Sequence, residues 1–168
     1  KACDMIENMD CVISLRAGSS FGDTRGYGKA VMLVAYDSRK HGMTQIKTCF
    51  PMLCVSGSTP EGLCFDAIMK DILDASRGKD AYFVNMSDGC PYFEGYYGEG
   101  AFNHTRAQVK KMVREGIKVI SYFITEGRTY GSDKENFQKM YGKEAQFIDT
   151  SKIAEVAKTM NSKFLEVA

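Results

Sequence analysis

The chain has 168 residues, of which 44% are hydrophobic and 26% are charged, and its formal net charge is +1. This length suits one domain with a sizeable core, and the composition is that of a globular protein. The near-neutral charge and the absence of a long basic run argue against nucleic-acid binding, and no apolar stretch is long enough to span a membrane.

The first sixty residues are predicted to contain two strands and one helix. A short apolar run predicts a strand over 10–15, and the glycines of 18–28 predict a turn after it. Apolar residues at helical spacing then predict a helix over 29–40. Alternation of apolar and polar residues predicts a strand over 44–50, followed by a loop over 51–60.

From Thr59 onward the pattern alternates regularly between helix and strand. Thr59 followed by Pro60 is typical of a helix start, with the hydroxyl as cap, and an apolar stripe continues from Leu63 to Leu73. A long loop rich in glycine and aromatic residues occupies 90–100. The predicted strands are 81–86, 117–124 and 145–148, and the further predicted helices are 103–114, 133–141 and 152–163.

Strands separated by helices predict an α/β fold over 1–168, with a mostly parallel central sheet and helices on both faces. Right-handed crossovers would place the strand-to-helix loops at one edge of that sheet, where ligands of such folds bind. Three loops with hydroxyl or acidic residues, 16–20, 57–60 and 87–89, are therefore expected to converge.

Cysteine usage and the first residue bear on where the protein works. The six cysteines lie mostly in apolar runs, which favours reduced, buried thiols and a cytoplasmic location. Because the chain begins with Lys1 and has no apolar leader, we expect it to be the C-terminal part of a longer protein.

One motif points to catalysis. Residues 18–22 match the G-x-S-x-G pattern of a serine nucleophile, with Asp88 and His104 following in hydrolase order. The pattern requires a helix that begins at Ser20, whereas the glycine-rich turn intervenes. His104 is expected to be exposed. A small serine hydrolase that uses Ser20 is therefore the alternative function; phosphate-loop and dinucleotide motifs fail at required glycines.

A family resemblance covers nearly the whole chain. Residues 12–21 look like the first strand and metal loop of a von Willebrand factor A domain, 57–63 resemble its threonine-bearing loop, and 83–91 resemble its aspartate-glycine loop. The continuation over 105–120 is most similar to the branch found in cobalt-chelatase-type subunits. The resemblance implies a three-layer, Rossmann-like arrangement of one mostly parallel sheet between helices.

The resemblance also implies a metal-ion-dependent adhesion site. Family members hold Mg²⁺ with an Asp-x-Ser-x-Ser loop, a threonine and an aspartate, and hard oxygen ligands suit this ion. The matching positions are Arg16, Gly18, Ser20, Thr59 and Asp88. Arginine and glycine replace the first aspartate and serine, so Ser20, Thr59 and Asp88 are expected to form a degenerate site. The guanidinium of Arg16 either bridges Asp88 or points into solvent.

The aromatic loop beside Asp88 is either a protein-recognition surface or a loop folded back on its own rings. We predict a non-catalytic interaction module whose partner, by resemblance, is an AAA+ ATPase subunit in a chelatase-like complex. No catalytic residue is assigned. The candidate partner-binding residues are Arg16, Asp88, Tyr92, Phe93, Tyr96 and Tyr97.

Overall fold

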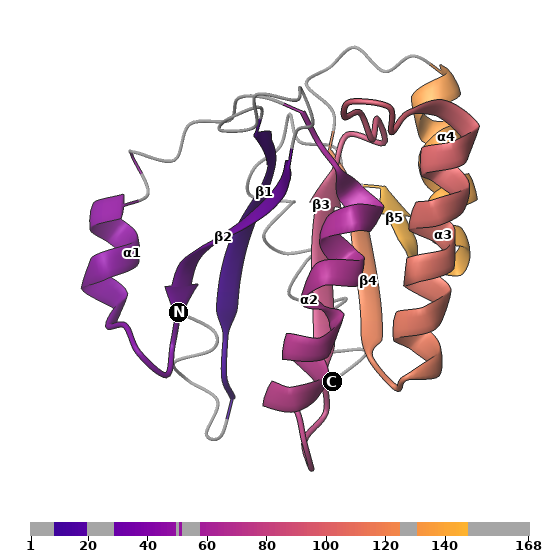
Figure 1. Ribbon diagram of the computed structural model, residues 1–168. Helices are drawn as coiled ribbons and strands as arrows, with labels where there is room; N and C mark the ends of the chain where they lie inside the picture. The colour runs from indigo at the N-terminus through magenta and orange to yellow at the C-terminus, as the bar shows by residue number, and fades with distance from the viewer. Residues whose placement is uncertain (1–8, 20–28, 50, 52–57, 125–130, 148–168) are drawn as a thin grey trace. The chain divides into compact units, whose positions relative to one another are not determined.

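The computed structural model describes residues 9–19, 29–49, 51, 58–124 and 131–147 (Figure 1). These residues form strands and helices of an α/β protein, grouped in two compact units, Lys1–Pro60 and Glu61–Ala168. None of the helices in the described ranges combines the length and the apolar character that crossing a bilayer requires.

The first unit contains an antiparallel pair of strands and a short helix. Strand β1 (Val12–Ser19) pairs with β2 (Lys29–Asp37), with Val12 opposite Asp37 at one end and Ser19 opposite Lys29 at the other. The register shifts between Ile13 and Ser14. Helix α1 (Met43–Cys49) follows β2.

Two predictions for this unit are wrong. The predicted helix over 29–40 is strand β2, and the predicted strand over 44–50 is helix α1. The apolar residues of β2 fit a helical spacing, but pairing with β1 along its whole length decides the conformation. In α1, Thr48 Oγ1 donates to the Thr44 carbonyl at 3.0 Å, a contact made across one helical turn.

The second unit holds a parallel sheet, and here the predicted elements agree with the structure. The sheet has the order β3-β4-β5, so the prediction of a mostly parallel sheet is confirmed for these strands, whereas β1 and β2 are antiparallel. The predicted helix over 103–114 begins earlier, at Gly98, and the predicted helix over 152–163 lies outside the described residues. The elements are α2 (Glu61–Ala75), β3 (Tyr82–Ser87), α3 (Gly98–Arg114), β4 (Lys118–Phe123), α4 (Gly131–Tyr141), the 3₁₀ turn η3 (Gly142–Glu144) and β5 (Ala145–Phe147).

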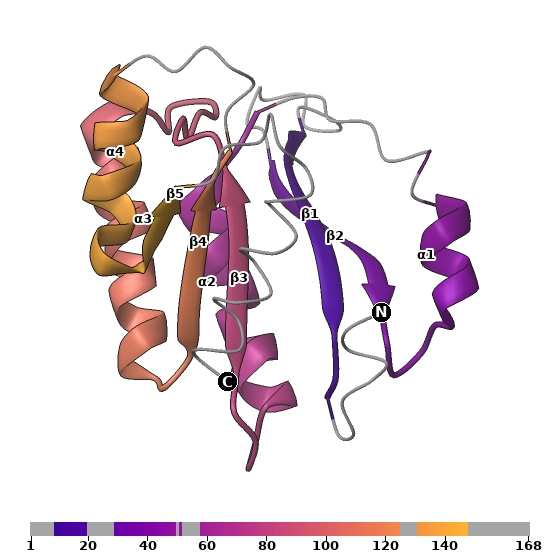
Figure 2. The ribbon, with the colours of Figure 1, turned by 180° about the vertical axis from the view of Figure 1, so that it is seen from behind.

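Helices α2, α3 and α4 lie on one face of this sheet, as the opposite views in Figures 1 and 2 show. Strand β4 is the middle strand, and its side chains from Val119 to Phe123 are buried on both faces. The ring of Phe137 lies at the centre of the core, 5.2 Å from Phe123 and 4.5 Å from Tyr141 between centroids. The other buried core residues are Phe65, Met69, Val109, Met112, Ile117 and Met140.

The apolar stripe of α2 agrees with the predicted one in part, since Ile72 and Leu73 are half-buried and pack against the core. The buried apolar residues are Cys64, Phe65 and Met69, whereas Leu63 is half-buried and Ala67 is exposed. Phe65 packs edge-on against Phe83 of β3 with 5.0 Å between ring centroids. Burial of the large side chains of Phe65 and Met69 removes much apolar area from water, which favours their position against the sheet.

Candidate functional site

The turn after β3 is built from short backbone contacts at the carboxyl end of the parallel sheet. The N–H of Gly89 donates to Ser87 Oγ at 3.1 Å, and the N–H of Cys90 donates to Asp88 Oδ1 at 3.0 Å. Gly89 has a φ of 79°, and a Cβ there would lie 2.7 Å from the Asp133 carbonyl oxygen. Only glycine suits this position, and the carboxylate of Asp88 is left exposed at the edge.

Cys90 lies among acidic groups at this edge. Burial raises the pKa of its thiol to about 11, and the nearby carboxylates of Asp133 and Asp88 act in the same direction. A thiol with this pKa is almost entirely protonated at neutral pH, so Cys90 is poorly suited to be a nucleophile or a metal ligand.

A hairpin with a two-residue turn follows. We call residues 91–97 the tyrosine hairpin. Phe93 and Tyr96 exchange both backbone hydrogen bonds, each at 2.8 Å, across Glu94 and Gly95. Gly95 has a φ of 69°, as such a tight turn requires. The side chain of Phe93 is buried at 6% exposure. The hairpin is therefore held by its own backbone and by one buried aromatic anchor.

The hydroxyl of Tyr96 is the second anchor. It donates to the Ala101 carbonyl at 3.2 Å and lies 3.1 Å from both His104 Nδ1 and Thr105 Oγ1 on α3. Burial raises the pKa of Tyr96, so this hydroxyl stays protonated. Gly62 of α2 permits the approach, because a Cβ there would lie 2.5 Å from the hydroxyl oxygen.

Two tyrosines of the hairpin point away from these anchors. Tyr92 is 65% exposed and Tyr97 is 63% exposed, with their ring centroids 6.2 Å apart and their planes tilted by 32°. The two interpretations of the aromatic loop therefore both apply, to different residues: Phe93 and Tyr96 fold back, and Tyr92 and Tyr97 face solvent. Asp88 precedes this surface in the same loop.

The remaining predicted site residues belong to the first unit. Arg16 and Gly18 lie within β1, opposite Met32 and Ala30 of β2, and Arg16 is half-buried. The N–H of Gly18 donates to the Ser58 carbonyl at 2.8 Å, which brings the first and second predicted loops together next to Thr59. Ser20 lies outside the described residues. β1 pairs with the antiparallel strand β2, whereas the predicted metal loop was expected to follow a strand of the mostly parallel sheet.

His104 does not have the surroundings that the hydrolase alternative requires. It is half-buried rather than exposed, which corrects the prediction. Gln108 Nε2 lies 3.1 Å from its Nε2, and the Tyr96 hydroxyl lies 3.1 Å from its Nδ1. Both ring nitrogens are thus used by neutral groups, and neither is left for the Asp88 contact of a catalytic triad.

Sequence reasoning missed a buried polar cluster beneath this edge. Glu61, the first residue of α2, is fully buried, and its Oε1 accepts from Tyr141 Oη at 2.5 Å and from Asn85 Nδ2 at 3.2 Å. Asn85 also donates to Tyr141 Oη at 2.8 Å. The cluster joins α2, β3 and α4. An asparagine inside the apolar run 81–86 was the one feature of the sequence that pointed to it.

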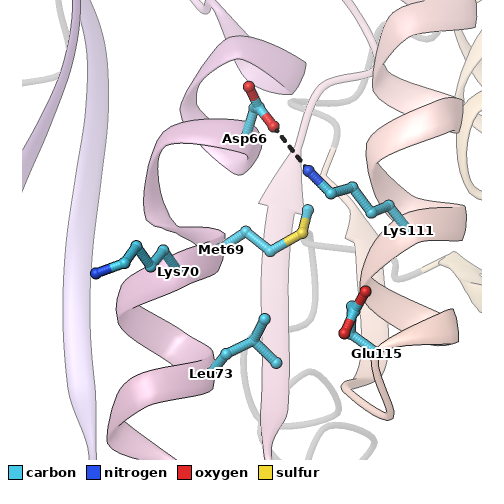
Figure 3. A pocket seen from close by; sticks show the side chains of 6 residues that line it. All are labelled: Asp66, Met69, Lys70, Leu73, Lys111 and Glu115. Carbon is cyan, nitrogen blue, oxygen red and sulfur yellow. Dashed lines mark hydrogen bonds and ion pairs between the residues drawn. The ribbon is translucent and has the colours of Figure 1, made fainter.

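A shallow groove of about 230 Å³ lies between α2 and α3 (Figure 3). Met69 and Leu73 form its apolar part, and Lys111 bridges it to Asp66 at 3.4 Å. Lys70 and Glu115 complete its lining, with Lys70 directed away from α3 in Figure 3. The groove holds surface charges and apolar stems.

Across the described ranges, no three His, Cys, Asp or Glu side chains gather closely enough to hold a metal ion. The site therefore consists of an exposed carboxylate, a raised-pKa thiol and two exposed tyrosines on an anchored hairpin. These groups can recognise a ligand by stacking, hydrogen bonding and charge. No family model matches this chain, and no curated protein matches it either.

Proposed function

We propose that the protein is a non-catalytic protein–protein interaction module of von Willebrand factor A type, a single domain over 1–168 with helices on both faces of its sheet, of which α2, α3 and α4 occupy one. The parallel order β3-β4-β5, with loops at its carboxyl edge, supports this proposal. By the resemblance of the sequence, the partner is an AAA+ ATPase subunit of a chelatase-like complex.

The observation that carries the proposal is the tyrosine hairpin. Two backbone hydrogen bonds join Phe93 and Tyr96 and fix the hairpin. Tyr92 and Tyr97 are therefore held in place, although their side chains are 65% and 63% exposed. Large exposed aromatic side chains on a rigid support are typical of recognition surfaces, because little conformational entropy is lost when a partner covers them.

Site-specific photo-crosslinking tests the proposal. A benzophenone amino acid placed at Tyr92 or at Tyr97 should crosslink to the same partner protein in cells of the source organism. The same amino acid at Glu115, which is also exposed, should not crosslink to that protein. The captured protein, once purified, should bind the wild-type chain and lose affinity for Tyr92→Ala. Equal capture from all three positions would contradict an interaction surface at the hairpin.

The metal part of the proposal concerns Ser20, Thr59 and Asp88. These residues would offer two hydroxyls and one carboxylate to Mg²⁺, a donor set with a single negative charge, and Arg16 would either repel the ion or take its place beside Asp88. A calorimetric titration of Mg²⁺ and Mn²⁺ tests this, with Asp88→Asn as the matched variant because it keeps an acceptor for the Cys90 N–H. Saturable heat that Asp88→Asn abolishes would support metal-dependent binding, and no heat in either protein would support a metal-free interaction.

A further inference from the structure

We propose that the tyrosine hairpin binds a basic, arginine-containing peptide segment, with a guanidinium group stacked on Tyr92 and Tyr97. This inference rests on the proposed function, because it names the chemistry of the partner at the same surface. Three observations carry it: the geometry of the two rings, the charge of the segment around them, and cation–aromatic pairs elsewhere in the second unit.

The two rings form one exposed aromatic surface. Their centroids are 6.2 Å apart and their planes are tilted by 32°, so the two rings are close neighbours, and a flat cation can stack on an exposed ring face. A guanidinium is planar and weakly hydrated, and it stacks on tyrosine better than an ammonium does. The anchors at Phe93 and Tyr96 hold the hairpin before the ligand arrives, which lowers the cost of binding.

The segment that carries the rings is acidic. From Ala81 to Thr105 the sequence contains no Lys or Arg. Glu99 forms an ion pair with Lys139 at 3.2 Å, and the acidic residues nearest in sequence to Tyr92 are Glu94 and Asp88, both exposed. Carboxylates in the same segment as the rings attract a cation and repel phosphate, so the charge of this segment favours a basic peptide over a nucleic acid.

The same unit already contains cation–aromatic contacts. The Lys118 ammonium lies 4.8 Å from the centroid of Tyr82, and the Lys134 ammonium lies 4.6 Å from the centroid of Phe147. Within the described residues, no such cation is placed over Tyr92 or Tyr97, although their rings are the more exposed. A cation from another molecule would complete the same kind of pair.

Fluorescence anisotropy with a labelled peptide tests the inference. The probe is a short Gly/Ser peptide with three arginines, compared with matched peptides that carry lysine or citrulline at the same positions. We expect the order arginine, lysine, citrulline in falling affinity. Tyr92→Ala combined with Tyr97→Ala should weaken arginine-peptide binding about tenfold, since each exposed cation–π contact contributes modestly. Tyr92→Phe keeps the ring and should bind like the wild type.

Charge is tested separately. Glu94→Gln should weaken binding of the arginine peptide, whereas Glu115→Gln, which removes the same charge at the far end of α3, should leave it unchanged. Equal binding of the arginine and citrulline peptides, or of the wild type and the double alanine variant, would overturn the inference. Tighter binding of a labelled oligothymidine than of the peptide would overturn it in favour of base stacking. If the peptide experiment fails but crosslinking at Tyr92 still captures a protein, the inferred chemistry of the ligand is wrong, and the proposed protein-interaction function is still supported.

Discussion

Gly62 of α2 and Tyr96 of the hairpin are so close that a Cβ on Gly62 would lie 2.5 Å from the tyrosine hydroxyl oxygen. The same Cβ would lie 2.9 Å from the Thr105 Cα, which is backbone and cannot swing away. The missing side chain of a helical glycine thus makes room for the hydroxyl that anchors the tyrosine hairpin. The position of Tyr92 and Tyr97 depends on this contact between α2, α3 and the loop.

Gly62→Ala should therefore destabilise the protein, by about 1–3 kcal/mol, although alanine favours helices. Gly100→Ala is the matched control, because Gly100 lies within α3, and a Cβ there would meet nothing within 4 Å. That variant should gain about 0.5–1 kcal/mol from helix propensity. Urea unfolding followed by circular dichroism measures both, and a stabilised Gly62→Ala protein would contradict the described packing.

Because Tyr141 belongs to the buried polar cluster with Glu61 and Asn85, Tyr141→Phe should lower the free energy of unfolding. The change removes the hydroxyl that donates to Glu61 and accepts from Asn85, while the ring that packs on Phe137 stays. Leaving buried polar groups without this hydroxyl should cost about 1–3 kcal/mol.

Tyr82→Phe is the control for that variant. Its hydroxyl accepts from Lys118 Nζ at 2.8 Å, but this contact is only half-buried, so its loss should cost less. Urea titrations of the wild type and the two variants measure the loss of unfolding free energy that each substitution causes. If Tyr141→Phe and Tyr82→Phe unfold at the same midpoint as the wild type, the buried cluster contributes nothing to stability.

The Cys90 thiol predicts slow alkylation. With a pKa of about 11, only about one thiol in ten thousand is ionised at pH 7, so iodoacetamide should react far more slowly with Cys90 than with free cysteine. Asp133→Asn removes a charge that raises this pKa and should speed the reaction at pH 8. Asp66→Asn, on the exposed side of α2, should not change it. Peptide mass spectrometry follows the rates, and rapid labelling of the wild type at pH 7 would refute the raised pKa.

Asp37 predicts a pH-dependent contribution to stability. Both of its carboxylate oxygens accept from the Arg39 guanidinium at 2.9 Å, and this contact lowers the pKa of Asp37 from 3.8 to about 2. A lowered pKa means that the stabilisation is complete above pH 3.8 and is lost as the pH falls through 2. Because Arg39 is 41% exposed and water screens the pair, Asp37→Asn should cost about 1 kcal/mol at pH 7.

The difference between the wild type and Asp37→Asn should therefore shrink between pH 4 and pH 2. Asp74→Asn is the comparison, since Asp74 pairs with Lys70 and Arg77 on the exposed side of α2 and its carboxylate is 43% exposed. It should cost less than Asp37→Asn. Thermal unfolding at several pH values tests this, and a difference that stays constant down to pH 2 would contradict it.

The sequence by itself determined most of the second unit. Strands 81–86 and 117–124, the helix after Pro60 and the turn at Asp88-Gly89 were predicted because their apolar runs and caps are local patterns. The exposure of part of the aromatic loop was also anticipated as one of two alternatives. These elements agree with the structure because local propensity and burial favour the same conformation.

Tertiary structure alone decided the rest. The segment 29–37 has apolar residues at helical spacing, yet pairing with 12–19 makes it a strand, since its backbone groups are satisfied by the neighbouring chain. Which tyrosines of the hairpin face solvent depended on the close approach of Gly62 to Tyr96, across 34 positions that no local pattern connects. The burial of Glu61 likewise required Tyr141, which lies 80 positions away. Contacts between distant residues are set by packing, and packing is not encoded in any short window of sequence.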